Sequence, residues 1–189
     1  MIELCDHGGE DWRRLRAQFV TSSDATTLMG DNPYKTVAQL FHEKIHGIST
    51  PSNLHTERGI RMEPLIFEKF LAPLGAVRLG KVYISEEQPW LTASPDAFVR
   101  LTPGVFLYEI KCPADMSKFN SSRYYWQVYH QMMVMGSHRR GRILACDESL
   151  HDPQYYDIEL IPEAEEAYKQ ISFDFFLSLA RRELHPRFW

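Results

Sequence analysis

Two strand-forming segments in the middle of the chain constrain its fold more than any other feature. Residues 91–99 and 105–110 supply strand-forming side chains, and residues 102–104 between them read Thr-Pro-Gly, which is typical of a turn. The two segments are therefore predicted to be neighbouring strands of one sheet. Whatever side chains they carry on one face will be held close together.

The charged residues of these two strands form the first candidate site. Side chains alternate between faces along a strand, so Glu109 and Lys111 project to one side while Ile110 points into the core. Pro95 sets a sharp turn before Asp96, whose carboxylate we expect beside that of Glu109. Two such carboxylates repel each other unless a divalent cation joins them.

This cluster suits phosphodiester hydrolysis. The reaction needs a metal clamp, an activated water and a cation near the developing charge. Lys111 is placed to hold a water and to favour its deprotonated form. Ordinary surface hairpins also carry such a spacing, so these three residues alone leave both interpretations open.

The flanking sequence predicts helices around a sheet. Apolar periodicity and capping residues predict helices at residues 11–19, 25–29, 36–47, 57–71, 123–136 and 163–183. Further strands are predicted at residues 77–84, 142–146 and 155–161. This order predicts a mixed α/β fold with a central mixed sheet flanked by helices. No linker divides the chain, so we expect residues 1–189 to form a single domain. The fourth helix is expected to bury Ile60, Phe67, Phe70 and Leu71.

Composition narrows the class of protein. Of the 189 residues, 44% are hydrophobic, which is enough for one core, and no apolar run is long enough to span a bilayer. Residues 1–10 are too acidic for a signal peptide. Cys5, Cys112 and Cys146 are too few and too far apart for a disulfide framework, a zinc knuckle or an iron–sulfur cluster. We therefore expect a soluble, cytoplasmic protein without membrane contact.

The net charge of −4 argues against a protein that coats nucleic acid with surplus positive charge. An enzyme needs only a local basic track, and the basic residues do cluster, at positions 13, 14 and 16, at 118 and 123, and at 139, 140 and 142. The charge distribution therefore permits DNA binding without demonstrating it.

The two strands also resemble a known family. Ser-Pro-Asp-Ala at 94–97 and Tyr-Glu-Ile-Lys-Cys-Pro at 108–113 resemble the core of the PD-(D/E)xK nucleases, and more narrowly the lambda exonuclease or YqaJ-type viral recombinase branch. The resemblance extends over roughly residues 12–135. It implies a restriction-endonuclease-like core, and Mg²⁺ held by Asp96, Glu109 and the carbonyl of Ile110. It implies one or two such ions, for which Mn²⁺ would substitute.

Further site residues follow from the same resemblance. Residues 12–16 and 20–24 are similar to the N-terminal motif of the family, which implies that Arg16 and Ser23 bind the 5′-phosphate of a DNA end. A guanidinium and a hydroxyl at a helix N-terminus also make a natural anion site. Glu63 matches the acidic position of the family on a helix, and would add a third carboxylate to the metal site. Gln127 matches the glutamine near the reacting phosphate, and Gln131, one helical turn further on, is a supporting candidate.

A competing motif lies at residues 42–46, which read His-Glu-Lys-Ile-His and match the HExxH signature of zinc proteases. In that interpretation His42 and His46 would bind zinc and Glu43 would act as the general base. No downstream motif supplies a third ligand, and both histidines fall on the flank of the predicted helix. We therefore favour the nuclease and retain the metalloprotease as a remote alternative.

The resemblance implies a specific activity. The expected protein is a metal-dependent exonuclease that acts on double-stranded DNA ends, digests one strand from its 5′ end and leaves a 3′ overhang. It would serve phage-type recombination with a single-strand annealing protein, in a bacterial host. Family members form ring-shaped trimers, but this sequence leaves the homotrimer open. The nearest alternative is a junction-cleaving endonuclease with the same core, and a further one is a catalytically silent DNA-binding module.

Overall fold

The computed structural model describes residues 1–48, 53–102, 104–136 and 140–189. Pro103 of the predicted turn and Arg139 of the third basic cluster lie outside the described residues. Within the described part, the strands form two mixed sheets of five and four strands, with helices on their faces. The expected α/β class with mixed sheet and flanking helices is confirmed.

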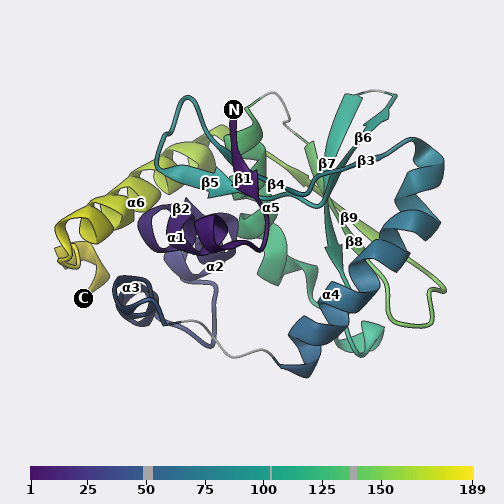
Figure 1. The fold of residues 1–189 in the computed structure, drawn as a ribbon, viewed down its shortest axis with the longest axis horizontal. Coiled ribbons are helices and arrows are strands. Elements are labelled where there is room, and N and C mark those ends of the chain that lie inside the picture. The colour runs from purple at the N-terminus through teal and green to yellow at the C-terminus, as the bar shows by residue number, and fades with distance from the viewer. Residues whose placement is uncertain (49–52, 103, 137–139) are drawn as a thin grey trace.

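The five-stranded sheet is the centre of the fold (Figure 1). Its strands, in spatial order, are β3 (Val77–Arg78), β6 (Ala97–Leu101), β7 (Gly104–Lys111), β8 (Arg140–Ala145) and β9 (Gln154–Glu159). The central pair β7 and β8 is parallel, and the other pairs are antiparallel. The predicted neighbours are indeed paired, with Ala97 opposite Tyr108 and Leu101 opposite Gly104. The strand carrying Glu109 and Lys111 therefore lies in the middle of this sheet.

The second sheet divides two strands that were predicted as continuous. Its spatial order is β1 (Ile2–Asp6), β4 (Lys81–Ile84), β5 (Leu91–Ala93) and β2 (Val20–Thr21). The predicted strand 91–99 breaks at Ser94-Pro95-Asp96, so that β5 and β6 belong to different sheets. The predicted strand 77–84 breaks between β3 and β4 in the same way. A proline cannot donate a ladder hydrogen bond, which explains the first break. It leaves Asp96 between the two sheets.

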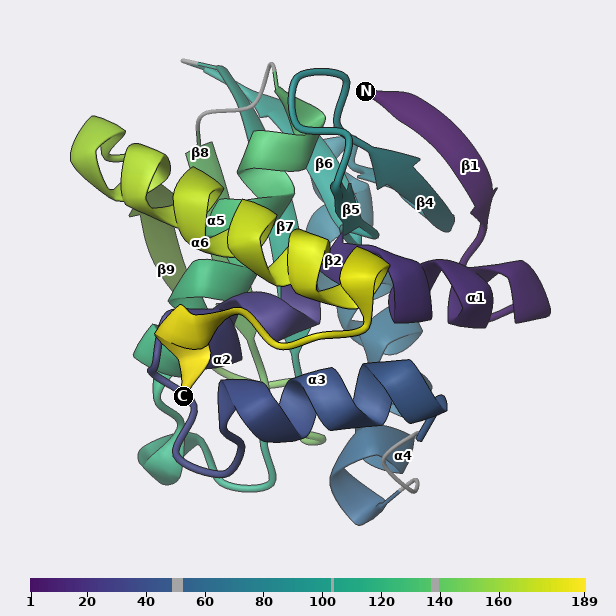
Figure 2. The ribbon, with the colours of Figure 1, turned by 90° about the vertical axis from the view of Figure 1, so that its left-hand side faces the viewer.

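Helices cover both faces of the central sheet. The helices are α1 (Glu10–Gln18), α2 (Ala25–Leu28), α3 (Val37–His46), α4 (Leu54–Ile66), α5 (Tyr125–Met135) and α6 (Pro162–Arg181). Met62 and Ile66 of α4 form one core with Tyr108 and Ile110. On the other face, α5 packs in a second core that includes Leu107 and Ile143. Figure 2 shows α6 crossing α5 on its outer side, with α3 below.

The ends of two helices illustrate what local sequence decides. Thr36 caps α3 by accepting a hydrogen bond from the backbone of Gln39, and Gly47 ends it in the left-handed region at φ 63°. Both the start of this helix at Thr36 and its end at Gly47 were predicted from the sequence. Helix α4 begins earlier than predicted, because Asn53 caps it, and it continues into a π-helical turn at Phe67–Leu71. The expected burial of Ile60 is wrong, since that side chain is 70% exposed.

Within the described residues, no helix is both long and apolar enough to cross a membrane.

Candidate active site

Glu109 is the centre of a buried polar cluster. It lies on the α5 side of β7 and is 4% exposed. Its Oε1 accepts hydrogen bonds from Lys111 Nζ and from Gln127 Nε2, both at 2.5 Å. Its Oε2 accepts from Gln131 Nε2 at 2.6 Å. One strand and one helix thus fix both carboxylate oxygens, and Gln131 contributes as directly as Gln127.

Asp96 lies next to this cluster at the break between β5 and β6. Its Oδ2 accepts a hydrogen bond from the backbone N–H of Ile110 at 2.6 Å, which locks the carboxylate onto β7. Burial, reinforced by the negative charges of Glu109 and Glu63, raises the pKa of Asp96 well above its usual value. Lys111 and the Ile110 N–H oppose this rise without cancelling it. The side chain of Ile110 is buried in the core with α4, as strand alternation predicted.

Lys111 is held between a carboxylate and an aromatic ring. Burial lowers the pKa of its ammonium group, but the charges of Glu109 and Asp96 outweigh that effect, so the net shift is upward. Its Nζ lies 4.7 Å from the ring centroid of Tyr124, at cation–π distance. The lysine is therefore positively charged at neutral pH. Tyr124 was not among the site residues predicted from the sequence.

The donor set fits a small divalent cation. Asp96 and Glu109 each offer carboxylate oxygens as ligands. Burial and the repulsion between the two carboxylates make two negative charges unfavourable at this place. Mg²⁺ needs only one or two carboxylates because it keeps several of its waters. The chemistry of the site therefore matches Mg²⁺, although no group of three His, Cys, Asp or Glu residues converges anywhere in the described chain. Glu63 lines the same cleft, where its Oε1 accepts from Arg78 at 2.9 Å.

Two cavities meet at the carboxylates. The larger, about 650 Å³, opens on the side of α4 and is lined by Glu63, Asp96, Glu109, Lys111, Lys118, Arg123 and Tyr124, among others. The smaller, about 210 Å³, lies on the side of α1 and is lined by His7, Trp12, Arg16, Ser23, Ser94, Asp96, Glu109 and Gln127, among others. The structure thus brings the predicted catalytic residues and the predicted phosphate ligands to one continuous site.

Arg16 and Ser23 form the polar wall of the smaller cavity. Arg16 lies in the last turn of α1, and Ser23 lies in the short 3₁₀ turn before α2. The Arg16 guanidinium donates to Ser23 Oγ at 3.1 Å and lies 4.9 Å from the ring centroid of Trp12. Ser94, His7 and Trp12 were not singled out as site residues from the sequence. Trp12 and Ser94 lie within the motif segments, whereas His7 has no such signal, because only chain folding brings it to the cavity.

The HExxH residues do not form a metal centre. His42 and His46 lie on one face of α3 with ring centroids 4.4 Å apart. Glu43, the base in the protease interpretation, is paired with Lys35 at 2.5 Å. In the described residues no third ligand joins the histidines. Lys44, at one of the two variable positions of the motif, has a buried side chain that contacts the wall carrying Arg16.

Comparison with solved structures places this fold among exonucleases. An alkaline exonuclease from Laribacter hongkongensis is 22% identical with a TM-score of 0.71, and covers 92% of this chain and 94% of its own. The same enzyme in complex with dAMP gives a TM-score of 0.72 at 20% identity and the same coverage. A phage-related exonuclease from Haemophilus somnus is 12% identical with a TM-score of 0.65, over 90% of this chain and 98% of that one. The expected restriction-endonuclease-like fold is thereby confirmed.

The sequence was also compared with curated proteins and with family models. No curated protein matches it. The model of the YqaJ-like viral recombinase domain matches residues 11–138, which is more than half of the chain and includes Arg16, Asp96, Lys111 and Gln127. The chain therefore belongs to the family of YqaJ-like viral recombinase domains.

Proposed function

We propose that this chain is a metal-dependent exonuclease that hydrolyses one strand of duplex DNA from its 5′ end and leaves a 3′ overhang. One observation carries the proposal: Asp96, Glu109 and the Arg16–Ser23 pair line a single cavity. An anion site next to two carboxylates suits a terminal phosphate beside a scissile bond. Family membership and the exonuclease names of the structural neighbours support the same activity.

Each residue has a role that follows from its contacts. Asp96 and Glu109 would hold Mg²⁺, with the Ile110 carbonyl as a further ligand and Glu63 as a third carboxylate at the edge. Bound there, Mg²⁺ would act as a Lewis acid on the phosphodiester and make water a stronger nucleophile at neutral pH. The charged ammonium of Lys111 would orient the attacking water. Gln127 and Gln131 would fix the Glu109 carboxylate through the hydrogen bonds that they donate.

The terminal phosphate gives the enzyme its polarity. Arg16 offers a fixed guanidinium and Ser23 a hydroxyl, and together they suit the oxygens of a phosphate monoester better than an internal phosphodiester. A DNA end held there by its 5′-phosphate presents the next phosphodiester to the carboxylates. The single strand that remains would be the substrate of an annealing protein in phage-type recombination. A ring-shaped homotrimer would make such digestion processive.

An end-dependence assay tests the proposal. Three matched substrates are compared with Mg²⁺: linear duplex with 5′-phosphate, the same duplex with 5′-hydroxyl, and covalently closed circular DNA. The expected result is rapid release of mononucleotides from the phosphorylated 5′ end, slower release from the hydroxyl end and none from circles. Mn²⁺ is expected to replace Mg²⁺, and chelation to stop the reaction. Efficient cutting of circles would overturn the exonuclease in favour of an endonuclease.

The catalytic core is tested in the same assay. Lys111→Ala and Asp96→Asn are expected to remove hydrolysis of all substrates, whereas Glu43→Gln is expected to leave it intact. Loss of activity in Glu43→Gln with retention in Asp96→Asn would instead support the metalloprotease motif. Absence of hydrolysis by the native chain on every DNA form, with either metal, would leave only a DNA-binding role.

A further inference from the structure

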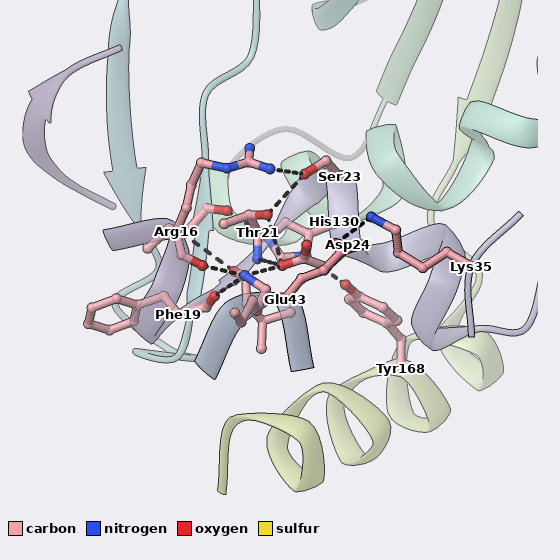
Figure 3. A network of polar contacts seen from close by, with 12 residues as sticks. Arg16, Phe19, Thr21, Ser23, Asp24, Lys35, Glu43, His130 and Tyr168 are labelled. Atoms are coloured by element: carbon pink, nitrogen blue, oxygen red, sulfur yellow. Dashed lines mark hydrogen bonds and ion pairs between the residues drawn. The ribbon is translucent and has the colours of Figure 1, made fainter. Parts of the chain in front are cut away.

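A buried ion pair lies beneath the anion site. Asp24 Oδ2 and Lys44 Nζ are 2.7 Å apart, and their side chains are only 4% and 7% exposed. Taking two charges out of water is costly, and an apolar pair of similar volume is often at least as stable. The pair therefore calls for an explanation other than stability. Figure 3 shows Asp24 among Arg16, Thr21 and Ser23.

Lys44 holds the helix that carries Arg16. Its ammonium group donates to the backbone carbonyls of Arg16 and of Phe19, the latter at 3.0 Å. These carbonyls lie at the C-terminal end of α1, where backbone acceptors have no partner within the helix. A positive charge is also favourable at that end of the helix dipole. Lys44, which reaches across from α3, thus fixes the turn from which the Arg16 side chain extends.

Asp24 holds the turn that carries Ser23. Its Oδ2 accepts from the backbone N–H of Thr21 at 2.8 Å and from the Thr21 hydroxyl at 2.9 Å. The Thr21 hydroxyl is also 3.1 Å from Ser23 Oγ. Because a carboxylate only accepts, the Thr21 proton is committed to Asp24, and Ser23 must donate to Thr21 while it accepts from Arg16. The chain of hydrogen bonds therefore runs from Arg16 through Ser23 and Thr21 to Asp24.

The pair also balances charge beneath the site. Burial raises the pKa of Asp24, but the positive charges of Lys44 and Arg16, with the hydrogen bonds from Lys44 and from the Thr21 N–H, outweigh that effect, so the net shift is downward and Asp24 stays ionised. Without Lys44, the buried carboxylate of Asp24 would be left with Arg16 as its main counter-ion. The guanidinium would then be attracted inward, and less of its charge would be available to an anion in the cavity.

We propose that the buried Asp24–Lys44 pair is a positioning device for Arg16 and Ser23, and that it sets how strongly the enzyme prefers a 5′-phosphate over a 5′-hydroxyl DNA end. The inference rests on the proposed function and deepens it. It also gives the segment 42–46 a role that is independent of the HExxH match, because Lys44 occupies one of the two variable positions of that motif. Neither Asp24 nor Lys44 lines either of the two cavities, so we assign both a positioning role and not a catalytic one.

The test measures a ratio of two rate constants, which stays the same even if part of the variant protein is unfolded. The values of kcat/KM on 5′-phosphate and 5′-hydroxyl duplexes are determined for each variant, and their quotient does not depend on the fraction of active enzyme. Lys44→Met is expected to reduce this preference about tenfold, the size of one lost charge-assisted contact. Affinities for the same two duplexes, measured by anisotropy in a Lys111→Ala background, are expected to converge in parallel.

A milder variant, Thr21→Val, provides a test in case Lys44→Met does not fold. Thr21→Val keeps the size of the side chain and leaves the Asp24–Lys44 pair in place, but it removes the hydroxyl that links Asp24 to Ser23. We expect it to lower the preference several-fold, about as far as one neutral hydrogen bond allows. Thr21→Ser restores the hydroxyl and is expected to restore the preference.

The matched control is a second ion pair that involves α3. Glu43 lies on this helix and Lys35 precedes it; their charged atoms are 2.5 Å apart, and their side chains are a little over a quarter exposed. Lys35 donates to Glu43, whereas Lys44 donates to the carbonyls at the end of α1. The double variant Lys35→Met/Glu43→Gln is expected to keep the native preference. This inference, but not the proposed function, is overturned if Lys44→Met and Thr21→Val both keep the native preference. If Lys44→Met does not fold, a native preference in Thr21→Val is enough to overturn it. A native enzyme that cuts both ends equally overturns end recognition itself, and the inference with it.

Discussion

At the scale of single residues, three hydrogen-bond donors contact the two carboxylate oxygens of Glu109. Lys111 and Gln127 share Oε1, and Gln131 takes Oε2 from a position with no solvent exposure. The Oε1 of Gln131 has no partner among the described residues, so the amide is oriented by Glu109 alone. A carboxylate fixed in this way loses little entropy when it binds a cation or a substrate-bound water.

Removal of the Lys111 charge tests its role directly. Lys111→Met keeps most of the volume of the side chain and is expected to reduce the single-turnover rate by about 10²–10⁴-fold, as for other losses of acid–base assistance. Binding of duplex DNA should change little, because the anion site is intact. Lys169→Met removes a partly exposed lysine of α6 that pairs with Glu165, and serves as the control. A normal cleavage rate in Lys111→Met would exclude the lysine from the chemistry.

His130 makes stability depend on pH. It is fully buried between Tyr168 Oη at 2.6 Å and the Thr92 carbonyl at 2.9 Å, and burial lowers its pKa to about 4. The unfolded chain, with a histidine pKa near 6.5, therefore binds more protons between pH 6.5 and 4. The stabilisation is complete above that window and is lost as the pH falls through it.

The expected loss is on the order of 3 kcal/mol in the free energy of unfolding across the window. Urea titrations of the native chain and of His130→Gln at several pH values measure it. His130→Gln is expected to have a lower free energy of unfolding than the native chain at pH 7, but to lose less of that free energy as the pH falls. Parallel pH profiles for the two proteins would show that His130 is not the titrating group.

At the scale of elements, the approach of α5 to β8 determines where Gln127 and Gln131 lie. Gly141 on β8 faces Val128 and Met132 of α5 so closely that a Cβ there would be 2.3 Å from Val128 Cγ1. Its backbone conformation is one that other residues adopt, so glycine is required by space alone. The position of α5 over Glu109 thus depends on Gly141 having no side chain.

Gly141→Ala is therefore expected to push α5 outward. Overpacking of this kind costs about 1–3 kcal/mol in the free energy of unfolding. Displacement of the two glutamines should also lower the cleavage rate more than the population of unfolded protein explains. Gly80→Ala, where no atom lies within 4 Å of the new methyl group, is the control. Full activity in a destabilised Gly141→Ala would show that α5 can shift without disturbing Glu109.

At the scale of the whole molecule, cation binding should be visible as global stability. A ligand that binds only the folded state adds about 2.7 kcal/mol at a hundredfold excess over its Kd. We expect Mg²⁺ or Mn²⁺, without DNA, to raise the Tm of the native chain. Asp96→Asn should abolish that increase. Without metal the same variant should be at least as stable as the native chain, because it removes a carboxyl that burial and neighbouring charges disfavour.

Glu43→Gln on α3 provides the matched control for this measurement, since it changes a carboxylate outside the cleft. Its metal-induced increase in Tm should equal that of the native chain. An equal increase in Asp96→Asn would place the cation elsewhere and contradict the assignment of the two carboxylates.

What the sequence determined by itself is local. The period of the side chains placed Glu109 and Lys111 on one face of a strand and Ile110 on the other, and capping residues set the ends of α3. Each of these depends on neighbours within about one helical turn or a few strand residues, which hydrogen-bond geometry and side-chain periodicity specify directly. The resemblance of the motifs to a family supplied the rest of the candidate site.

Only the tertiary structure decided which of these local pieces meet. It divided two predicted strands between two sheets at Pro95 and near Gly80, and so placed Asp96 where it bonds to β7. It brought Lys44 from α3 beneath Arg16, and Gln131 onto Glu109. Such contacts join residues far apart in the chain, and their energy comes from burial and charge pairing that exist only after folding. The local pattern therefore identified the candidate catalytic residues, and long-range packing brought them together.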